Sequence, residues 1–188
     1  MNVYDFDNTI YDGESAVDFF MFCLGKDIKL IKLLPLLVVK MVKYKLCLIS
    51  VEELERYVLR YAKKLIDDFD DMDLILDQFW QKHFHKIKPF YLKQKKEDDI
   101  ILTATFEFLI KIPVEKLGIK NVIASQIDMQ TGEFKRICFR QNKVSLLKEH
   151  IDNTDNICFY TDSMNDKPVI DLAKEAYLVK GNKIKRLK

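Results

Sequence analysis

The sequence predicts an α/β protein in which a parallel β-sheet receives one long helical insertion directly after its first strand. From Pro89 onward, short apolar runs alternate with helical segments, a pattern typical of buried parallel strands joined by helical crossovers. Residues 14–88 instead have an almost wholly helical pattern, which interrupts that alternation. A chain of 188 residues has room for one such domain with a smaller helical sub-domain.

The expected elements can be placed in chain order. The first strand ends at Asp5, and the helix Ser15–Leu24 has apolar residues on nearly every face, which predicts burial against other helices. A capping-box pattern at Ser50 and Glu53 opens a further helix, and Trp80 falls on the core side of the last helix of the insertion. We then expect strands at 99–105, 120–125, 156–160 and 176–179, a hairpin within 127–136, helices at 107–117, 143–150 and 166–173, and finally a basic tail. Pro113 is expected to bend or end its helix.

Composition excludes several classes of protein. An apolar content of 48% and a charged content of 32% describe a globular protein, not a disordered one. A net charge of +2 argues against a nucleic-acid partner. The four cysteines are far apart and lack metal-ligand spacing, and residues 1–9 lack a basic segment, so we expect a cytoplasmic protein without a signal peptide.

The first candidate site is the stretch DFDNT, which contains Asp5 and Asp7. Side chains two residues apart in a strand project to the same side, so the two carboxylates should point together where the strand ends. Carboxylates held that close repel unless a cation lies between them or one of them takes a proton. Thr9 and nearby backbone amides are candidate donors to an anionic ligand. A plain acidic, solvated turn explains the same stretch.

A second pair of carboxylates, Asp162 and Asp166, straddles a strand-to-helix turn. The carboxyl ends of parallel strands share one edge of a sheet, so both pairs, together with Thr103 and Thr105, are expected to meet there. An N-capped helix start is the simpler explanation of the second pair alone. Four carboxylates together would suit Mg²⁺, with Lys143 as the compensating cation.

Together these segments resemble the four motifs of the haloacid dehalogenase superfamily. They stand in order as DFDNT, ILTAT, NKVSLLKE and TDSMNDKPVI, and the likeness covers essentially the whole chain. It implies a Rossmann-like catalytic core of residues 1–13 and 89–188, with a helical cap of residues 14–88 like that of the phosphoserine-phosphatase branch. It further implies a Mg²⁺-dependent phosphatase acting on a phosphomonoester.

The resemblance also assigns roles to residues. It implies that Asp5 is the nucleophile and that Asp7 is the general acid and later the base. Thr103 would hold a phosphoryl oxygen, and Lys143 would neutralise the nucleophile and the phosphoryl group.

For Mg²⁺, the resemblance implies the carboxylates of Asp5 and Asp162 and the backbone carbonyl of Asp7, with Asp166 a direct or indirect ligand. Glu14 and Asn165 would bind the substrate. Two departures are a Thr before Asp162, where the family usually has Gly, and Thr103 in place of the commoner Ser.

The substrate is less closely defined. The segment TATFE lacks the glycine pair that phosphoserine phosphatases show, so phosphoserine is a less favoured substrate. The segments NVIASQI and DSMNDKPVIDLAKEAYLVKGNKIKRL are similar to a subgroup that contains bacterial phosphatidylglycerophosphate phosphatases. A lipid head-group phosphate and a small soluble phosphate ester therefore both stay open.

Residues 28–49 form a very apolar segment that also contains five lysines. The lysines argue against a membrane-spanning helix, because each is costly near the bilayer centre. Lys29, Lys32, Lys40 and Lys43 fall on one side of a helical wheel, a pattern that suits a helix lying on the inner face of a membrane. The other interpretation is a cap helix buried against its neighbours or against a second copy of the chain.

Two other classes of function are alternatives to a phosphatase. A receiver-like module would accept phosphate on an aspartate without turnover, but in receivers that aspartate follows a third strand. A catalytically silent relative would act as a binding or scaffold protein, although every chemical position is filled here. The oligomeric state is not predicted.

Overall fold

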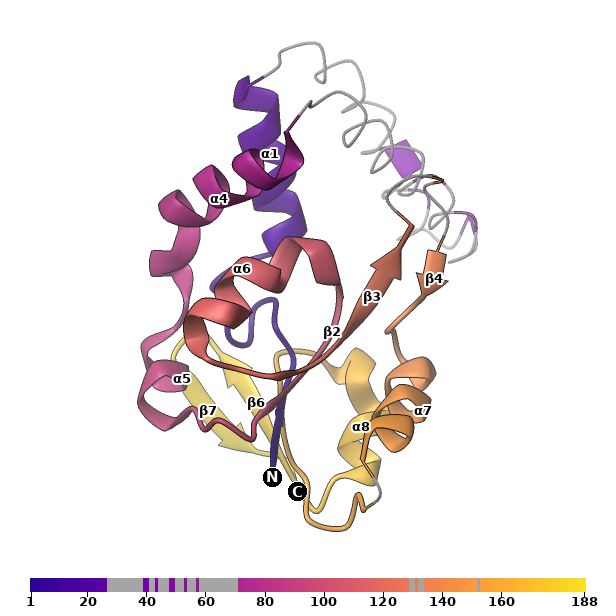
Figure 1. The fold of residues 1–188 in the computed structure, drawn as a ribbon. Coiled ribbons are helices and arrows are strands. Elements are labelled where there is room, and N and C mark those ends of the chain that lie inside the picture. The colour runs from indigo at the N-terminus through magenta and orange to yellow at the C-terminus, as the bar shows by residue number, and fades with distance from the viewer. Residues whose placement is uncertain are drawn as a thin grey trace.

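The computed structural model describes residues 1–26, 39–40, 43, 48–49, 53, 57, 71–128, 131, 134–151 and 153–188. Its centre is one sheet in the order β4-β3-β2-β1-β5-β6-β7 (Figure 1). The strands are β1 (Asn2–Tyr4), β2 (Ile100–Phe106), β3 (Asn121–Ile127), β4 (Phe134–Arg136), β5 (Cys158–Thr161), β6 (Glu175–Lys180) and β7 (Lys183–Arg186). All neighbours pair in parallel except the two outer pairs, β3–β4 and β6–β7. The predicted α/β fold with a mostly parallel sheet is confirmed.

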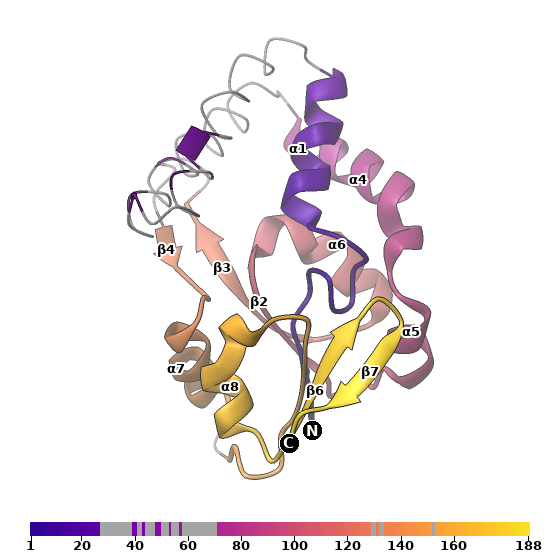
Figure 2. The ribbon, with the colours of Figure 1, turned by 180° about the vertical axis from the view of Figure 1, so that it is seen from behind.

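Helices cover both faces of this sheet. The described helices are α1 (Ser15–Lys26), α4 (Met72–His83), α5 (Pro89–Gln94), α6 (Glu107–Leu117), α7 (Gln141–His150) and α8 (Lys167–Leu172), with short 3₁₀ turns η2 (Phe84–Lys86) and η3 (Met164–Asp166). One core joins Tyr4 and Ile101 of the sheet to α1, α4 and α6, and a second joins Val3 and Leu102 to α7 and α8. Seen from behind, α7 and α8 lie on the face opposite α6 (Figure 2). Strand β1 therefore lies between two apolar layers, and its carboxyl end opens at the sheet edge.

The predicted burial of α1 against other helices holds for one side of the helix only. Phe19 and Cys23 are buried, with Phe19 edge-on to Phe79 of α4 at 5.2 Å between ring centroids. Val17 and Met21, on the other side of the same helix, are half exposed. The apolar side chains on the second side of α1 are therefore not covered by another element of the described part of the protein.

The basic tail expected at the C-terminus is instead the edge strand β7. It pairs antiparallel with β6 through a turn in which Gly181 has a φ of 58°. All four residues of β7 are exposed, and three of them are basic, so the sequence lacks the apolar alternation that predicts a half-buried strand. Lysines on an outer strand hinder edge-to-edge pairing with another chain.

Pro113 lies inside α6, which continues to Leu117, so the proline does not end the helix. A proline cannot donate a hydrogen bond to the carbonyl four residues earlier, which here belongs to Leu109. The indole N–H of Trp80 in α4 donates to that carbonyl at 2.6 Å. The free acceptor of one helix thus becomes the attachment point of the other.

Most of the segment 28–49, with the capping-box residue Ser50, lies outside the described residues. Of its lysines, Lys40 pairs with Glu53 at 3.4 Å and lies over the ring of Tyr57, while Lys43 is exposed. Within the described ranges, no helix is both long and apolar enough to cross a bilayer.

Candidate active site

The predicted site residues lie where the central strands end. Asp5 directly follows β1, Asp162 follows β5, and Thr103 lies in β2 two residues beyond Ile101, the last β2 residue that pairs with β1. Parallel pairing puts β1 between β2 and β5, in register at Tyr4 with Ile101 and Tyr160. The three strand ends are therefore adjacent at one edge of the sheet, as expected from the sequence.

Lys143 of α7 links two of the aspartates. Its Nζ lies 3.2 Å from Oδ1 of Asp5 and 2.9 Å from Oδ1 of Asp166. Lys143 is only 2% exposed and Asp5 only 9%, so little water screens the pairs. Burial lowers the pKa of Lys143, but the two carboxylates outweigh it and raise that pKa above its ordinary value. The lysine therefore stays charged.

Asp5 has more negative neighbours than one ammonium can offset. Burial is the main cause that raises the pKa of Asp5 to about 7, and Asp166 and Asp7 add to it. Lys143 and the backbone N–H of Phe6, which donates to Oδ1 at 2.9 Å, act in the opposite direction. A further cation near Asp5 would favour its ionised form.

Asp7 has neutral partners instead. The backbone N–H of Ser15, at the start of α1, donates to Oδ1 at 2.8 Å, and the hydroxyl of Thr105 donates to Oδ2. Burial raises the pKa of Asp7, and these hydrogen bonds offset the rise only in part. Burial therefore makes Asp7 easier to protonate than an exposed aspartate.

The loop after Asp7 positions Glu14. Asn8 has a φ of 55°, and its side-chain amide donates to Oε1 of Glu14 at 2.6 Å. Burial, together with the charges of Asp7 and Asp162, raises the pKa of Glu14. Glu14 is thus close to the aspartates and half exposed, as a substrate-contacting residue must be.

The other predicted residues differ in accessibility. Thr103 is almost fully buried, and its hydroxyl accepts the N–H of Thr105 at 3.1 Å. Thr9 is fully buried, and its hydroxyl has no hydrogen-bond partner among the described residues. The side chain of Asn165 is exposed.

The residue types at the site fit Mg²⁺, the metal that the resemblance implies. Among the described residues, no three Asp, Glu, His or Cys side chains converge as a ready metal cluster. Mg²⁺ does not need one, because it binds through one or two carboxylates and keeps several waters. Burial raises the pKa of Asp162, as it does that of Asp5, so both carboxylates would gain from a nearby cation. In contrast, Asp166 already has Lys143 and the hydroxyl of Thr161 as partners, the latter at 2.8 Å.

Sequence reasoning placed Thr105 at this edge but missed two other residues that contact the site, Thr161 and Lys88. Thr105 binds Asp7, Thr161 binds Asp166, and the Nζ of Lys88 donates to the main-chain carbonyl of Asn8. Thr105 lies on the same side of its strand as Thr103, and both were expected at this edge. Nothing in the pattern around Lys88 indicated its contact.

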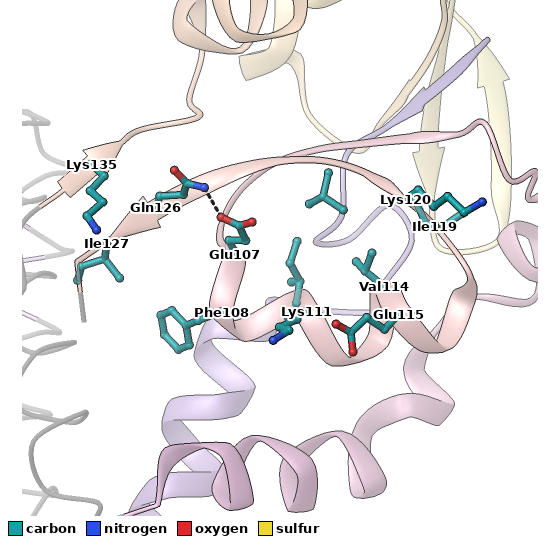
Figure 3. A pocket seen from close by; sticks show the side chains of 12 residues that line it. Glu107, Phe108, Lys111, Val114, Glu115, Ile119, Lys120, Gln126, Ile127 and Lys135 are labelled. Carbon is teal, nitrogen blue, oxygen red and sulfur yellow. Dashed lines mark hydrogen bonds between the residues drawn. The ribbon is translucent and has the colours of Figure 1, made fainter. Parts of the chain in front are cut away.

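A cavity of about 690 Å³ lies elsewhere, between α6 and β3 (Figure 3). Its floor includes Val114 and Ile119, and at one end Gln126 donates a hydrogen bond to Glu107. No predicted site residue lines it. This cavity is therefore separate from the aspartates and Lys143 at the ends of the central strands.

Comparison with protein families places the chain. The sequence model of the haloacid dehalogenase-like hydrolase family matches residues 3–171, which include Asp5, Thr103, Lys143 and Asp166. No curated protein sequence matches the chain.

Solved structures have the same fold at low sequence identity. A protein with unknown function from Bordetella pertussis Tohama I is 16% identical, with a TM-score of 0.75 over 94% of this chain and 87% of that one. A phosphoserine phosphohydrolase-like protein from Francisella tularensis is 18% identical, with a TM-score of 0.59 over 93% and 84%. A phosphoserine phosphatase solved as a phospho-aspartyl intermediate analogue is 16% identical, with a TM-score of 0.56 over 93% and 83%.

Proposed function

The chain belongs to the haloacid dehalogenase-like hydrolase family, and we propose that it is a phosphatase that hydrolyses a phosphomonoester through an aspartyl-phosphate on Asp5. The observation that carries this proposal is the contrast between two neighbouring carboxylates. Asp5 contacts a buried ammonium, whereas Asp7 is held by an amide and a hydroxyl. A nucleophile must be ionised and a general acid must hold a proton: Lys143 favours the ionised form of Asp5, whereas burial raises the pKa of Asp7.

In the first step, an oxygen of Asp5 attacks phosphorus and the bond from phosphorus to the ester oxygen breaks. Asp7 gives its proton to the departing oxygen, so an alcohol leaves and a phosphoryl group stays on Asp5. Lys143, 3.2 Å from Asp5, offsets charge on the nucleophile and on the phosphoryl oxygens.

In the second step, the now ionised Asp7 takes a proton from water. The resulting hydroxide attacks phosphorus, the bond to Asp5 breaks, and inorganic phosphate leaves. Asp5 is again a carboxylate and Asp7 again holds a proton, so the cycle closes.

The proposal includes Mg²⁺, held by the carboxylates of Asp5 and Asp162 and the main-chain carbonyl of Asp7. When bound, it would supply positive charge to the phosphoryl oxygens and to the nucleophile. The raised pKa values of Asp5 and Asp162 support this placement, because both carboxylates lack sufficient compensating charge.

Two substrate classes remain for the test. Phosphoserine phosphatases among the similar structures support a small soluble ester. The likeness of the C-terminal segment to phosphatidylglycerophosphate phosphatases supports a phospholipid head-group phosphate, and this is the substrate we favour. It implies peripheral contact with the inner face of a membrane.

One screen tests both levels of the proposal. The purified chain is assayed for phosphate release from an aryl phosphate, phosphoserine, a lysophospholipid phosphate and phosphatidylglycerophosphate, with Mg²⁺ and with a chelator. We expect Mg²⁺-dependent release from the aryl phosphate, and faster release from the lipids than from phosphoserine. No release from any ester would refute the phosphatase, whereas a preference for phosphoserine would refute only the lipid.

The proposed membrane contact has its own test. Vesicles with anionic lipid should sediment the protein more strongly than neutral ones, and salt should weaken the effect, because each lysine near an anionic surface contributes about 1 kcal/mol. Replacing Lys29, Lys32, Lys40 and Lys43 with glutamine should lower this affinity and leave aryl phosphate hydrolysis unchanged. Protein that stays in the supernatant at low salt with excess anionic lipid would exclude the contact.

A further inference from the structure

A buried lysine that belongs to none of the four motifs contacts the loop after β1. Lys88 is 3% exposed, and its Nζ donates to the main-chain carbonyl of Asn8. Within the described part of the chain, this is the one hydrogen bond of that ammonium. Burial lowers the pKa of Lys88, although Asp12 and Asp162 act against it. A buried ammonium is costly, so a specific contact is needed to account for it.

The partner, Asn8, holds the catalytic loop at three points. Its backbone N–H donates to the carbonyl of Gly13 at 2.9 Å, and its side chain binds Glu14 at 2.6 Å. Its carbonyl accepts the hydrogen bond from Lys88. Asn8 has a left-handed φ of 55°, so the backbone is no longer extended at this residue. The carbonyl bonded by Lys88 belongs to the peptide between Asn8 and Thr9, so Lys88 restrains the loop one residue after Asp7.

Lys88 also comes from the segment that ends the helical insertion. Its backbone N–H donates to the carbonyl of Ile10 at 2.8 Å, and the N–H of Asp12 donates to the carbonyl of Lys86 at 2.8 Å. Tyr11 and Ile87 form an antiparallel bridge between these bonds. The end of the insertion is therefore bonded along the loop that contains Asn8.

The start of the insertion meets the same loop. The N–H of Ser15, the first residue of α1, donates to the carboxylate of Asp7 at 2.8 Å. Both ends of the insertion thus contact the loop, one through the carboxylate itself and the other through Lys88.

We propose that Lys88 is a positioning residue, whose ammonium fixes the Asn8–Thr9 peptide, restrains the loop next to Asp7 and so keeps the Asp7 carboxyl directed at the leaving oxygen of the substrate. This inference rests on the proposed function. It differs from a purely structural role because it predicts a defect in one chemical task, proton delivery. That task matters most when the leaving alkoxide is a strong base.

The test compares an alkyl and an aryl phosphate in wild type, Lys88→Met and Lys88→Gln. Methionine keeps the length of the side chain and removes both the buried charge and the donor. A misplacement of about 1 Å can cost up to about a hundredfold in rate, so we expect kcat for the alkyl ester to fall by about ten- to a hundredfold. The aryl ester should lose less than about threefold, and KM should change little for either. Lys93→Met, which alters an exposed lysine of α5, is the matched control and should behave as wild type.

Hydrogen exchange gives a readout that does not depend on activity. Amides in the peptide covering residues 6–14 should exchange faster in Lys88→Met than in wild type, while those of α7 should not change. Equal losses for both esters, or no loss, or unchanged exchange in that loop would overturn the inference. If Lys88→Met does not fold, Lys88→Gln decides by the same two measurements. If the wild type hydrolyses neither ester, the proposed function fails, and the exchange measurement alone decides whether Lys88 holds the loop.

Discussion

Asp5 and Asp7 are separated by one residue, yet they lie in two different electrostatic surroundings. On the β5 side, Asp5 shares the ammonium of Lys143 with Asp166, so this region consists of closely packed charges. On the α1 side, Asp7 is held by a backbone amide and by the hydroxyl of Thr105. Both carboxylates follow β1, which ends at Tyr4, and the groups packed around each of them give it a different electrostatic environment. Substitutions in one region at a time should separate the two roles.

The largest effect is expected from the charged region. Asp5→Asn keeps the size of the side chain but removes the nucleophile, so phosphate release should fall by about 10⁴-fold or more. Steady-state assays with an aryl phosphate measure this, with circular dichroism to check folding. A folded Asp5→Asn protein with undiminished activity would exclude Asp5 as the nucleophile.

The neutral region should show a selective loss. Asp7→Asn removes the proton donor, so hydrolysis of an alkyl phosphate should fall by about 10²- to 10⁴-fold, while an aryl phosphate should lose much less. The ratio of the two kcat values is the measurement. Equal losses would assign Asp7 to another task.

The charged region should also make stability depend on pH in the metal-free protein. Because the pKa of Asp5 is raised to about 7 in the folded state, the folded protein retains a proton that the unfolded chain has lost above about pH 4. Stability should therefore fall as pH rises from 5 to 8, by at most about 3 kcal/mol from this residue. The raised pKa values of Asp7, Glu14 and Asp162 act in the same direction.

Urea unfolding with a chelator at pH 5 and pH 8 measures this slope. Asp5→Asn should flatten it and be more stable than wild type at pH 8, while Asp155→Asn, a change at an exposed aspartate, should not. A slope that is unchanged in Asp5→Asn would mean that another group titrates.

The smallest effect should come from the hydroxyl that holds Asp7. Thr105→Val keeps the shape of the side chain and removes a hydrogen bond of about 1 kcal/mol, which corresponds to about a fivefold loss in kcat for an alkyl phosphate. Thr154→Val, a change away from the site, is the control. A loss as large as that of Asp7→Asn would show that Thr105 does more than hold the carboxyl.

Much of the fold could be predicted because apolar runs and the turn residues between them are local signals in the sequence. Strands β2, β3, β5 and β6 lie within two residues of their expected positions, and the expected hairpin is the antiparallel pair β3–β4. Strand β7 could not be predicted in this way, because its pairing with β6 is a tertiary contact that its lysines do not indicate.

The candidate site could be predicted to the level of strand ends. Asp5, Asp7 and Asp162 follow strands that the pattern indicated, so their meeting at one edge required only parallel pairing. Which group bonds to which depends on side-chain packing. That is why the contacts of Asp166 with Thr161 and of Lys88 with Asn8 were not foreseen.

The bond from Trp80 to the carbonyl that Pro113 leaves free has a spectroscopic consequence. Trp80 is the chain's one tryptophan, fully buried, with its ring 5.6 Å from that of Tyr11 in the loop after β1. Its fluorescence should be blue-shifted in the folded protein and should shift to longer wavelength if water reaches the contact between α4 and α6. The protein therefore contains its own optical reporter of how the last helix of the insertion sits on the core. A titration with a phosphate ester or with Mg²⁺ can be followed through that emission without any label.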